Sequence, residues 1–265
     1  MGVPIAATIA GSDSGGGAGV QADMKTFSAL GVYGTSVITA LTAQNTTGVL
    51  AVHQVPAEFI TAQIDAVFSD FDIGAVKIGM LGSAAAIDAV AAGLDRHRAR
   101  NIVLDPVMAA TSGEKLLPAD AVGALRELAA QASLLTPNLP EAAILLEADV
   151  ARDEEEMRRQ ARTLLALGPG AVLIKGGHGS GAESVDLLVE GDACTRFAAP
   201  RIDTRNTHGT GCTLASAIAA GLAKKLSILD AVRDAKAYVS AAIAAADRLG
   251  VGSGRGPVHH FHKWW

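Results

Sequence analysis

The chain has 265 residues, with 22 Lys and Arg against 27 Asp and Glu, so its formal net charge is −5. This length suits one large α/β domain or two small ones, and the acidic balance argues against nucleic acid or an acidic membrane as a partner. The two cysteines, Cys194 and Cys212, form no C-x-x-C pair, so neither a disulfide framework nor a structural zinc site is indicated. Without a secretory signal or an apolar run of membrane-spanning length, the expected location is the cytoplasm.

A glycine-rich loop over residues 11–19 follows the first predicted strand, Val3–Ala10, and leads into a helix that is expected to stop at Gly31. Strand, glycine loop and helix is the layout of a nucleotide-binding turn. The chain contains no Gly-Lys pair, which excludes a Walker A motif. The dinucleotide fingerprint is met only in the relaxed form Gly17-x-Gly19-x-x-Ala22, and the acidic residue expected about 20 positions later is missing. We expect this loop to approach a ligand closely without being a Rossmann dinucleotide site.

Short strands alternate with helices along the rest of the chain. Tyr33–Ala43 and Val49–Val55 are predicted strands on either side of a turn, so a hairpin flap is expected at about residues 38–55. Further strands are predicted at Ala75–Met80, Asn101–Leu104, Leu134–Leu135, Ala171–Ile174 and Phe197–Ile202. Such alternation is typical of parallel β units, and with no linker or repeat it predicts one α/β domain over residues 1–265. Ligands then bind beyond the carboxyl ends of the strands.

The stretch Asn206–Thr213 indicates an anion-binding turn before a helix that begins near Gly211. Glycines at 209 and 211 let the backbone approach a ligand, and the unpaired N–H groups of a helix start favour negative charge. Gly209, Thr210 and Gly211 are therefore predicted to hold a phosphoryl group. Cys212 stands in the first helical turn, where the pKa of a thiol is expected to fall.

Other polar residues follow predicted strands at the same edge of the sheet. Asp105 and Glu141 are oxygen donors suited to magnesium. Each alone is more often a cap or turn residue, but their shared location at strand ends makes a metal site an equal alternative. Lys175 and Lys236 could neutralise phosphate charge. His208 could orient a neighbour or simply stabilise the turn. The histidines in the C-terminal tail, at about residues 252–265, are interpreted as a surface tail.

These parts suit phosphoryl transfer, in which catalysis is mostly positioning and charge stabilisation. Two other hypotheses remain open from the residues alone. One is thiol nucleophile chemistry with Cys212 and His208 as a pair. The other is a nucleotide-binding protein that catalyses nothing. Production of ADP from ATP and a small alcohol would separate the first hypothesis from both others.

The motifs taken together resemble the hydroxymethylpyrimidine/phosphomethylpyrimidine kinases of thiamin biosynthesis, from about residue 5 to the tail. The resemblance rests on Ala10–Gly19 with Gln21-Ala22-Asp23, Thr42–Thr46, Lys77–Leu81, Asp105–Met108, Thr136-Pro137-Asn138, Lys175–His178 and the 206–213 turn, in matching order. It implies a ribokinase-like fold with a mainly parallel sheet flanked by helices, usually as a homodimer. It also implies ATP, magnesium, and two successive phosphorylations of 4-amino-5-hydroxymethyl-2-methylpyrimidine.

The resemblance further implies a role for individual residues. Cys212 takes the place of the aspartate base found in many ribokinase-like enzymes. ATP is expected at Asn138, Lys175, Thr207 and Lys236, with the metal at Asp105 and Glu141. The pyrimidine pocket is expected to be lined by Gly11, Asp23, Gln44, Met80 and Val107. A glutamine amide complements an aminopyrimidine edge, as it does when Gln reads adenine. The alternative within the superfamily is a pyridoxal kinase, because pyridoxine also carries a hydroxymethyl group on a heteroaromatic ring.

Overall fold

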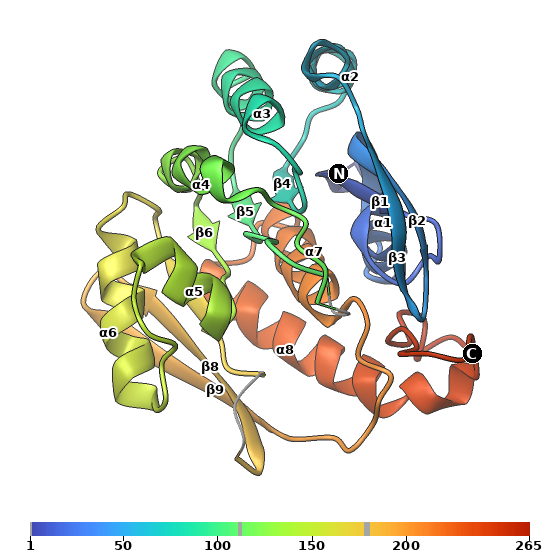
Figure 1. Ribbon diagram of the computed structural model, residues 1–265, viewed down its shortest axis with the longest axis vertical. Coiled ribbons are helices and arrows are strands. Elements are labelled where there is room, and N and C mark those ends of the chain that lie inside the picture. The colour runs from blue at the N-terminus through green and yellow to red at the C-terminus, as the bar shows by residue number, and fades with distance from the viewer. Residues whose placement is uncertain (1, 111–112, 178–180) are drawn as a thin grey trace.

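The computed structural model describes residues 2–110, 113–177 and 181–265, and these form one mixed sheet of nine strands (Figure 1). The strands are β1 (Ile5–Asp13), β2 (Tyr33–Asn45), β3 (Gly48–Gln54), β4 (Ala75–Ile78), β5 (Ile102–Leu104), β6 (Leu134–Leu135), β7 (Val172–Lys175), β8 (Glu183–Glu190) and β9 (Ala193–Pro200). Their order across the sheet is β3-β2-β1-β4-β5-β6-β7-β8-β9. The run from β2 to β7 is parallel, whereas β3 at one edge and β8 and β9 at the other are antiparallel.

Helices cover both faces of this sheet (Figure 1). They are α1 (Gly19–Ala29), α2 (Ala57–Phe68), α3 (Ala84–Arg96), α4 (Val122–Ala129), α5 (Leu139–Leu146), α6 (Glu154–Leu165), α7 (Thr210–Ala223) and α8 (Ile228–Ala244), with short 3-10 turns at Ala119–Ala121 and Ala246–Leu249. Alternate strand residues point to opposite faces. In β1, Ala7 and Ile9 therefore join the core under α2 to α6, while Ala6 joins the core under α1, α7 and α8. The prediction of a mainly parallel α/β fold is confirmed.

Small side chains bring α7 close to the sheet. The helix is rich in buried alanine, and the strand residues that share its core include Ala6, Ala75 and Ala171. Because these side chains are short, α7 contacts β1, β4 and β5 in the middle of the sheet. Its first turn therefore lies beyond the carboxyl ends of the central strands, which is where a ligand is expected in such folds.

The two edges of the sheet differ from the sequence-based prediction. β2 continues through Gln44 and Asn45, because Ser14 Oγ and the Gln44 backbone bond each other reciprocally, so the predicted turn shrinks to Thr46 and Thr47. The expected hairpin is present, but its first strand is also a parallel partner of β1. At the other edge, β8 was not predicted, and the expected strand Phe197–Ile202 lies earlier, at β9. These two strands form an antiparallel hairpin rather than a further parallel unit.

Two further observations complete the comparison. His178, which belongs to one of the motifs quoted above, lies outside the described residues. Among the residues that the structure describes, no helix is both long and apolar enough to cross a membrane.

Candidate active site

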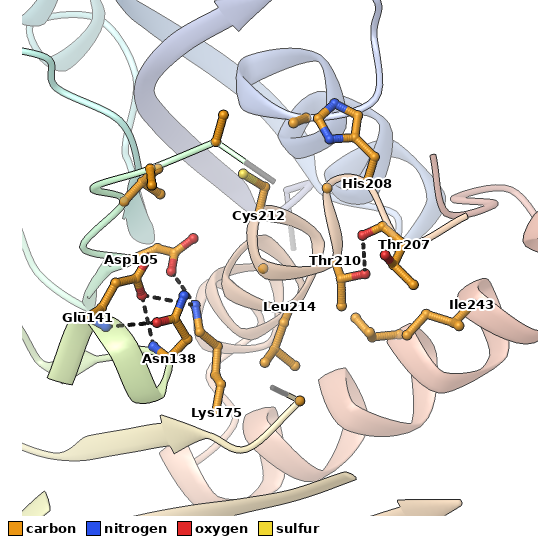
Figure 2. Close-up of a pocket in the computed structure, with 18 of the residues that line it drawn as sticks. Asp105, Asn138, Glu141, Lys175, Thr207, His208, Thr210, Cys212, Leu214 and Ile243 are labelled. Atoms are coloured by element: carbon orange, nitrogen blue, oxygen red, sulfur yellow. Dashed lines mark hydrogen bonds and ion pairs between the residues drawn. The ribbon is translucent and has the colours of Figure 1, made fainter. Parts of the chain in front are cut away.

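A cavity of about 650 Å³ opens at the carboxyl edge of the parallel strands. It brings together fourteen of the fifteen residues that the sequence assigned to a site, which come from strand ends, loops and helices spread over the chain. They are Gly11, Gln44, Met80, Asp105, Val107, Asn138, Glu141, Lys175, Thr207, Gly209, Thr210, Gly211, Cys212 and Lys236. Figure 2 shows Cys212 between the cluster of Asp105, Glu141 and Lys175 on one side and His208 on the other.

Asp23 is the exception, and its assignment to the pyrimidine pocket is wrong. The side chain is completely buried in α1 and faces the sheet. It accepts hydrogen bonds from Thr8 Oγ1 at 2.6 Å and Ser216 Oγ at 2.6 Å, and it forms an ion pair of 2.9 Å with Lys77 Nζ. A fully buried lysine requires a charged partner. Asp23 therefore serves Lys77 beneath the cavity and not the ligand within it.

The predicted phosphoryl turn is built by the packing of two glycine segments. Gly209 is the N-cap of α7 with φ +79°, and a Cβ atom on it would lie 1.9 Å from the carbonyl oxygen of Gly17. Only glycine fits a left-handed position that lies so close to another backbone. Thr210 Oγ1 donates to the Thr207 carbonyl at 2.7 Å, which closes the turn. The first turn of α7 consequently lines the cavity next to the glycine-rich loop.

Opposite this turn lies a charged cluster from three strand ends. Lys175 Nζ at the end of β7 lies 2.5 Å from Asp105 Oδ1 and 3.9 Å from Glu141 Oε2. Asn138 and Glu141 form a reciprocal capping box at the start of α5, with both bonds at 2.8 Å (Figure 2). A Cβ atom on Gly211 would lie 3.4 Å from Lys175 Nζ. The lysine thus lies directly across from the phosphoryl turn.

Burial raises the pKa of Glu141 to about 7, since the favourable charge of Lys175 offsets only part of the cost and the charge of Asp105 adds to it. Two carboxylates around one lysine leave an excess negative charge here. No cluster of three or more His, Cys, Asp or Glu side chains with metal-binding geometry occurs within residues 2–110, 113–177 and 181–265. Asp105 and Glu141 alone fit a magnesium ion whose other ligands are water and phosphate oxygens.

Lys236 on α8 points into the same cavity. Its ammonium group donates to Asp186 Oδ2 at 2.7 Å and to the Ser184 carbonyl at 3.0 Å, both on β8. The other oxygen of Asp186 accepts from the Gly176 N–H at 3.0 Å. This anchoring fixes a long, flexible side chain at the cavity wall. Asp186 carries no motif signal and lies on the strand that was not predicted, so sequence reasoning missed it.

The environment of Cys212 differs from the prediction. Burial raises the pKa of its thiol to about 11, although the nearby Lys77 ammonium favours the thiolate, because Asp23 and Asp105 add to the effect of burial. The helix N-terminus was expected to lower this pKa. Desolvation outweighs the helix dipole here, so the expected low thiol pKa is wrong and the free enzyme carries a neutral thiol at pH 7.

The far end of the cavity contains a polar group around Gln44. Thr42 Oγ1 lies 3.0 Å from Gln44 Oε1, and His208 Nε2 lies 3.4 Å from Gln44 Nε2. The same His208 nitrogen lies 3.0 Å from Asp13 Oδ2. Asp13 ends β1 and also accepts from the N–H groups of Gly15, Gly17 and Ala18, so it holds the glycine-rich loop in shape. Sequence reasoning missed Asp13, although its place directly after a strand was a usable signal.

The C-terminal segment does not form a surface tail, contrary to the prediction. His259 and His260 are only 2% and 5% exposed. His260 Nε2 lies 3.1 Å from Thr213 Oγ1, and its carbonyl accepts from Tyr238 OH at 2.6 Å. The backbone of His208 bonds Gly256 and Val258 in this segment. The segment therefore supports the phosphoryl turn, and it lies against the tip of the β2–β3 hairpin (Figure 1).

Comparisons with known proteins show which family the chain belongs to. The family model described as phosphomethylpyrimidine kinase matches residues 13–259. The chain belongs to the phosphomethylpyrimidine kinase family. A hydroxymethylpyrimidine/phosphomethylpyrimidine kinase of Rhizobium meliloti is 62% identical over 262 residues, which cover 98% of each chain. The expected family and the expected enzyme class, a phosphotransferase, are confirmed.

Solved structures place the family within a wider group of kinases. A phosphomethylpyrimidine kinase from Clostridium difficile has 44% identity and a TM-score of 0.81, over 90% of this chain and 99% of that one. An ADP complex of Bacillus subtilis pyridoxal kinase has 35% identity and a TM-score of 0.91, over 98% of both chains. The fold is thus shared with a phosphomethylpyrimidine kinase and with a pyridoxal kinase, and the acceptor has to be argued from the cavity.

Proposed function

We propose that this protein uses ATP to phosphorylate 4-amino-5-hydroxymethyl-2-methylpyrimidine, and then phosphorylates the resulting monophosphate, as a step of thiamin biosynthesis. One observation carries the proposal. A single cavity has a glutamine amide at one end, two anchored lysines at the other, and the start of α7 between them. This arrangement suits a planar aminopyrimidine, a triphosphate and a phosphoryl group in transit.

The donor end is assigned to Lys175, Lys236, Asn138 and Thr207. Lys175 and Lys236 are held by Asp105 and Asp186, so their charges are positioned before the nucleotide arrives. Such preorganised charge is the main source of catalysis in phosphoryl transfer. Magnesium would supply positive charge that offsets part of the phosphate charge here. Asp105 and Glu141 are the residues that would hold it, and proton release from Glu141 would accompany its binding at neutral pH.

The acceptor end is assigned to Gln44, Gly11, Met80 and Val107. Met80 Sδ would lie 3.1 Å from a Cβ atom on Gly11, so the glycine leaves room for a flat ring against the methionine. The hydroxymethyl group of a ring held by Gln44 would point toward Cys212 and the Gly209–Gly211 turn. Cys212, in its thiolate form, is proposed to take the hydroxyl proton as the alcohol oxygen attacks the γ-phosphorus of ATP and ADP leaves.

Pyridoxal kinase activity is the second candidate, supported by the structural likeness to kinases of that name. Mass spectrometry of the products formed from the pyrimidine alcohol and from pyridoxine, side by side with magnesium and ATP, decides between them. A monophosphate and then a diphosphate from the pyrimidine alone is the expected result. Products from pyridoxine alone would contradict the proposal, and absence of any ADP would favour a protein that binds nucleotide without catalysis.

The assignment of Gln44 has its own test. Gln44→Leu should reduce kcat/KM for the pyrimidine about 10- to 100-fold, because the polar edge of the substrate loses its partner, and leave the KM for ATP nearly unchanged. If use of the pyrimidine and of ATP is impaired to the same extent, Gln44 supports the whole site and does not bind the ring specifically.

We also propose that the protein acts in the cytoplasm as a homodimer, on small molecules and without nucleic acid or membrane partners. The net charge of −5 is consistent with this. Several exposed apolar side chains on and beside the β2–β3 hairpin, including Tyr33, Leu50 and Phe59, are candidates for a subunit contact.

A further inference from the structure

The side-chain amide of Gln44 lies between two polar side chains. The other hydrogen bonds of these two side chains decide whether each faces the nitrogen or the oxygen of the amide. The first is Thr42. Its hydroxyl lies 2.9 Å from the Ser12 carbonyl and 3.0 Å from the Gln44 amide. A hydroxyl has one proton, and the carbonyl can only accept it. When Thr42 donates to Ser12, its oxygen can only accept from Gln44, and this arrangement requires the amide nitrogen to face Thr42.

The second neighbour is His208, whose Nε2 lies 3.0 Å from Asp13 Oδ2. Asp13 is an ionised acceptor: burial opposes its charge, but His208 and the N–H groups of the glycine-rich loop outweigh burial and lower its pKa. Nε2 must therefore carry a proton. A protonated Nε2 has no lone pair, so it cannot accept from the Gln44 amide 3.4 Å away, and an amide nitrogen there would set two donors against each other. The amide oxygen is the end that suits this position, facing the same N–H that donates to Asp13.

Both arguments require the same orientation, in which the amide nitrogen faces Thr42 and the amide oxygen faces His208. The two ends of an amide are nearly indistinguishable by shape, and the hydrogen-bond network assigns them. We propose that Asp13 and His208 fix the Gln44 amide in this orientation, and that the fixed amide makes the enzyme select a ring edge with a donor and an acceptor in one order. His208 and Asp13 are thus positioning residues that determine specificity.

The proposal rests on the proposed function and deepens it. In the fixed orientation, Gln44 keeps one N–H on the Thr42 side and one oxygen lone pair on the His208 side. A ring nitrogen of the substrate pairs with the N–H, and the exocyclic amino group pairs with the oxygen. An analogue with a 4-oxo group in place of the 4-amino group has a protonated ring nitrogen and presents the reverse order. It could bind only if the amide turned over and lost both of its present partners.

His208 is held well enough for this role. Its backbone N–H donates to the Gly256 carbonyl at 3.0 Å, and its carbonyl accepts from Val258 at 3.2 Å. A Cβ atom on Gly17 would lie 2.4 Å from the ring, so the glycine is what allows the ring to lie flat on the loop. Replacing the side chain removes none of these backbone bonds.

The experiment compares kcat/KM for the 4-amino and the 4-oxo pyrimidine alcohols. The ratio of the two should fall about tenfold or more in His208→Leu, because one of the two bonds that orient the amide is lost. His208→Gln, which can still donate to Asp13 and Gln44, should restore most of the ratio. Thr42→Val should also lower the ratio. Thr35→Val makes the same change on the same strand, outside the cavity, and should leave the ratio unchanged. An unchanged ratio in His208→Leu and Thr42→Val would overturn the proposal.

A second measurement does not depend on turnover. Nitrogen NMR of the labelled His208 ring in the free enzyme should show a protonated Nε2 at neutral pH. An unprotonated Nε2 in the wild type would overturn the orientation even if the enzyme is active. A wild-type enzyme that ignores the 4-amino alcohol would overturn the proposed function instead.

Discussion

Cys212 carries a proton at neutral pH in the free enzyme, because burial raises its pKa to about 11. If its thiolate is the base for the alcohol, the rate of the first phosphorylation should rise about tenfold per pH unit from pH 7 toward this pKa. The monophosphate attacks through an oxygen that is already largely ionised near pH 7, so the second phosphorylation should lack this dependence.

Cys212→Ala should therefore slow phosphorylation of the alcohol by about 10²- to 10⁴-fold and phosphorylation of the monophosphate clearly less. Single-turnover rates for each step, measured across this pH range, check both expectations. Cys194→Ala is the matched control, because Cys194 lies on β9 away from the cavity. Equal losses in both steps would mean that Cys212 only packs the phosphoryl turn.

Asp105 and Lys175 form a nearly buried ion pair that has to be tested as a pair. Lys175→Met should cost about 3–5 kcal/mol of stability, since it leaves buried carboxylates uncompensated. The double variant Asp105→Asn/Lys175→Met should recover much of that stability in urea unfolding but none of the magnesium-dependent turnover. Recovery of turnover together with stability would remove both residues from the phosphate and metal assignment.

The loops that gather around the cavity could be predicted from the sequence more easily than the direction in which each side chain points. The motif that contains Asp23 lies beside the cavity, yet the Asp23 carboxylate is buried beneath it. Its partners Thr8, Lys77 and Ser216 belong to other elements, so the sequence around Asp23 does not reveal them. The thiol pKa was mispredicted for a similar reason. Position on a helix can be read from the sequence, but the burial that dominates this pKa comes from the tertiary fold.

At the scale of elements, the buried His260 of the C-terminal segment should make the folded protein less stable at acidic pH. Burial, together with neighbouring positive charges, lowers the pKa of His260 to about 3, against about 6.5 in an unfolded chain. The unfolded state therefore binds the extra proton first. The stability that neutral His260 contributes is complete above pH 6.5 and is lost as pH falls, at about 1.4 kcal/mol per pH unit.

His260→Gln keeps a side-chain donor for Thr213 but cannot titrate. Urea unfolding between pH 7 and pH 5 should show a steeper loss of stability in the wild type than in this variant. If the free energy of unfolding falls equally with pH in both proteins, His260 has an ordinary pKa and is not buried in solution.

The elements themselves were largely predictable where hydrophobic periodicity was strong, as in β1, β4 and α7. β8 was missed although Asp186 to Val189 are buried. The polar residues Glu183, Ser184 and Glu190 interrupt its apolar pattern, and no helix separates it from β7. Ligands bind beyond the carboxyl ends of parallel strands, and applying this rule to the predicted strands identified nearly all of the predicted residues that line the cavity.

For the molecule as a whole, the edge strand β3 presents exposed Leu50 and Val52 beside Phe59 of α2. Exposed apolar edges are normally covered by a partner. Sedimentation should give twice the chain mass of 26.9 kDa. Leu50→Glu should shift the protein toward monomer, whereas Val150→Glu, at an exposed apolar position on another part of the surface, should not. A monomeric wild type would contradict the dimer.

The support that residues 256–260 give to the phosphoryl turn has a consequence for the order of synthesis. These residues are synthesised well after the turn that they hold, because Thr213 and His260 are separated by 47 positions in the sequence. A nascent chain can form its sheet and its glycine-rich loop before then, but its phosphoryl turn lacks this support until residues 256–260 have been made. A chain that has not yet reached residue 256 would therefore lack the contacts that hold its phosphoryl turn in shape.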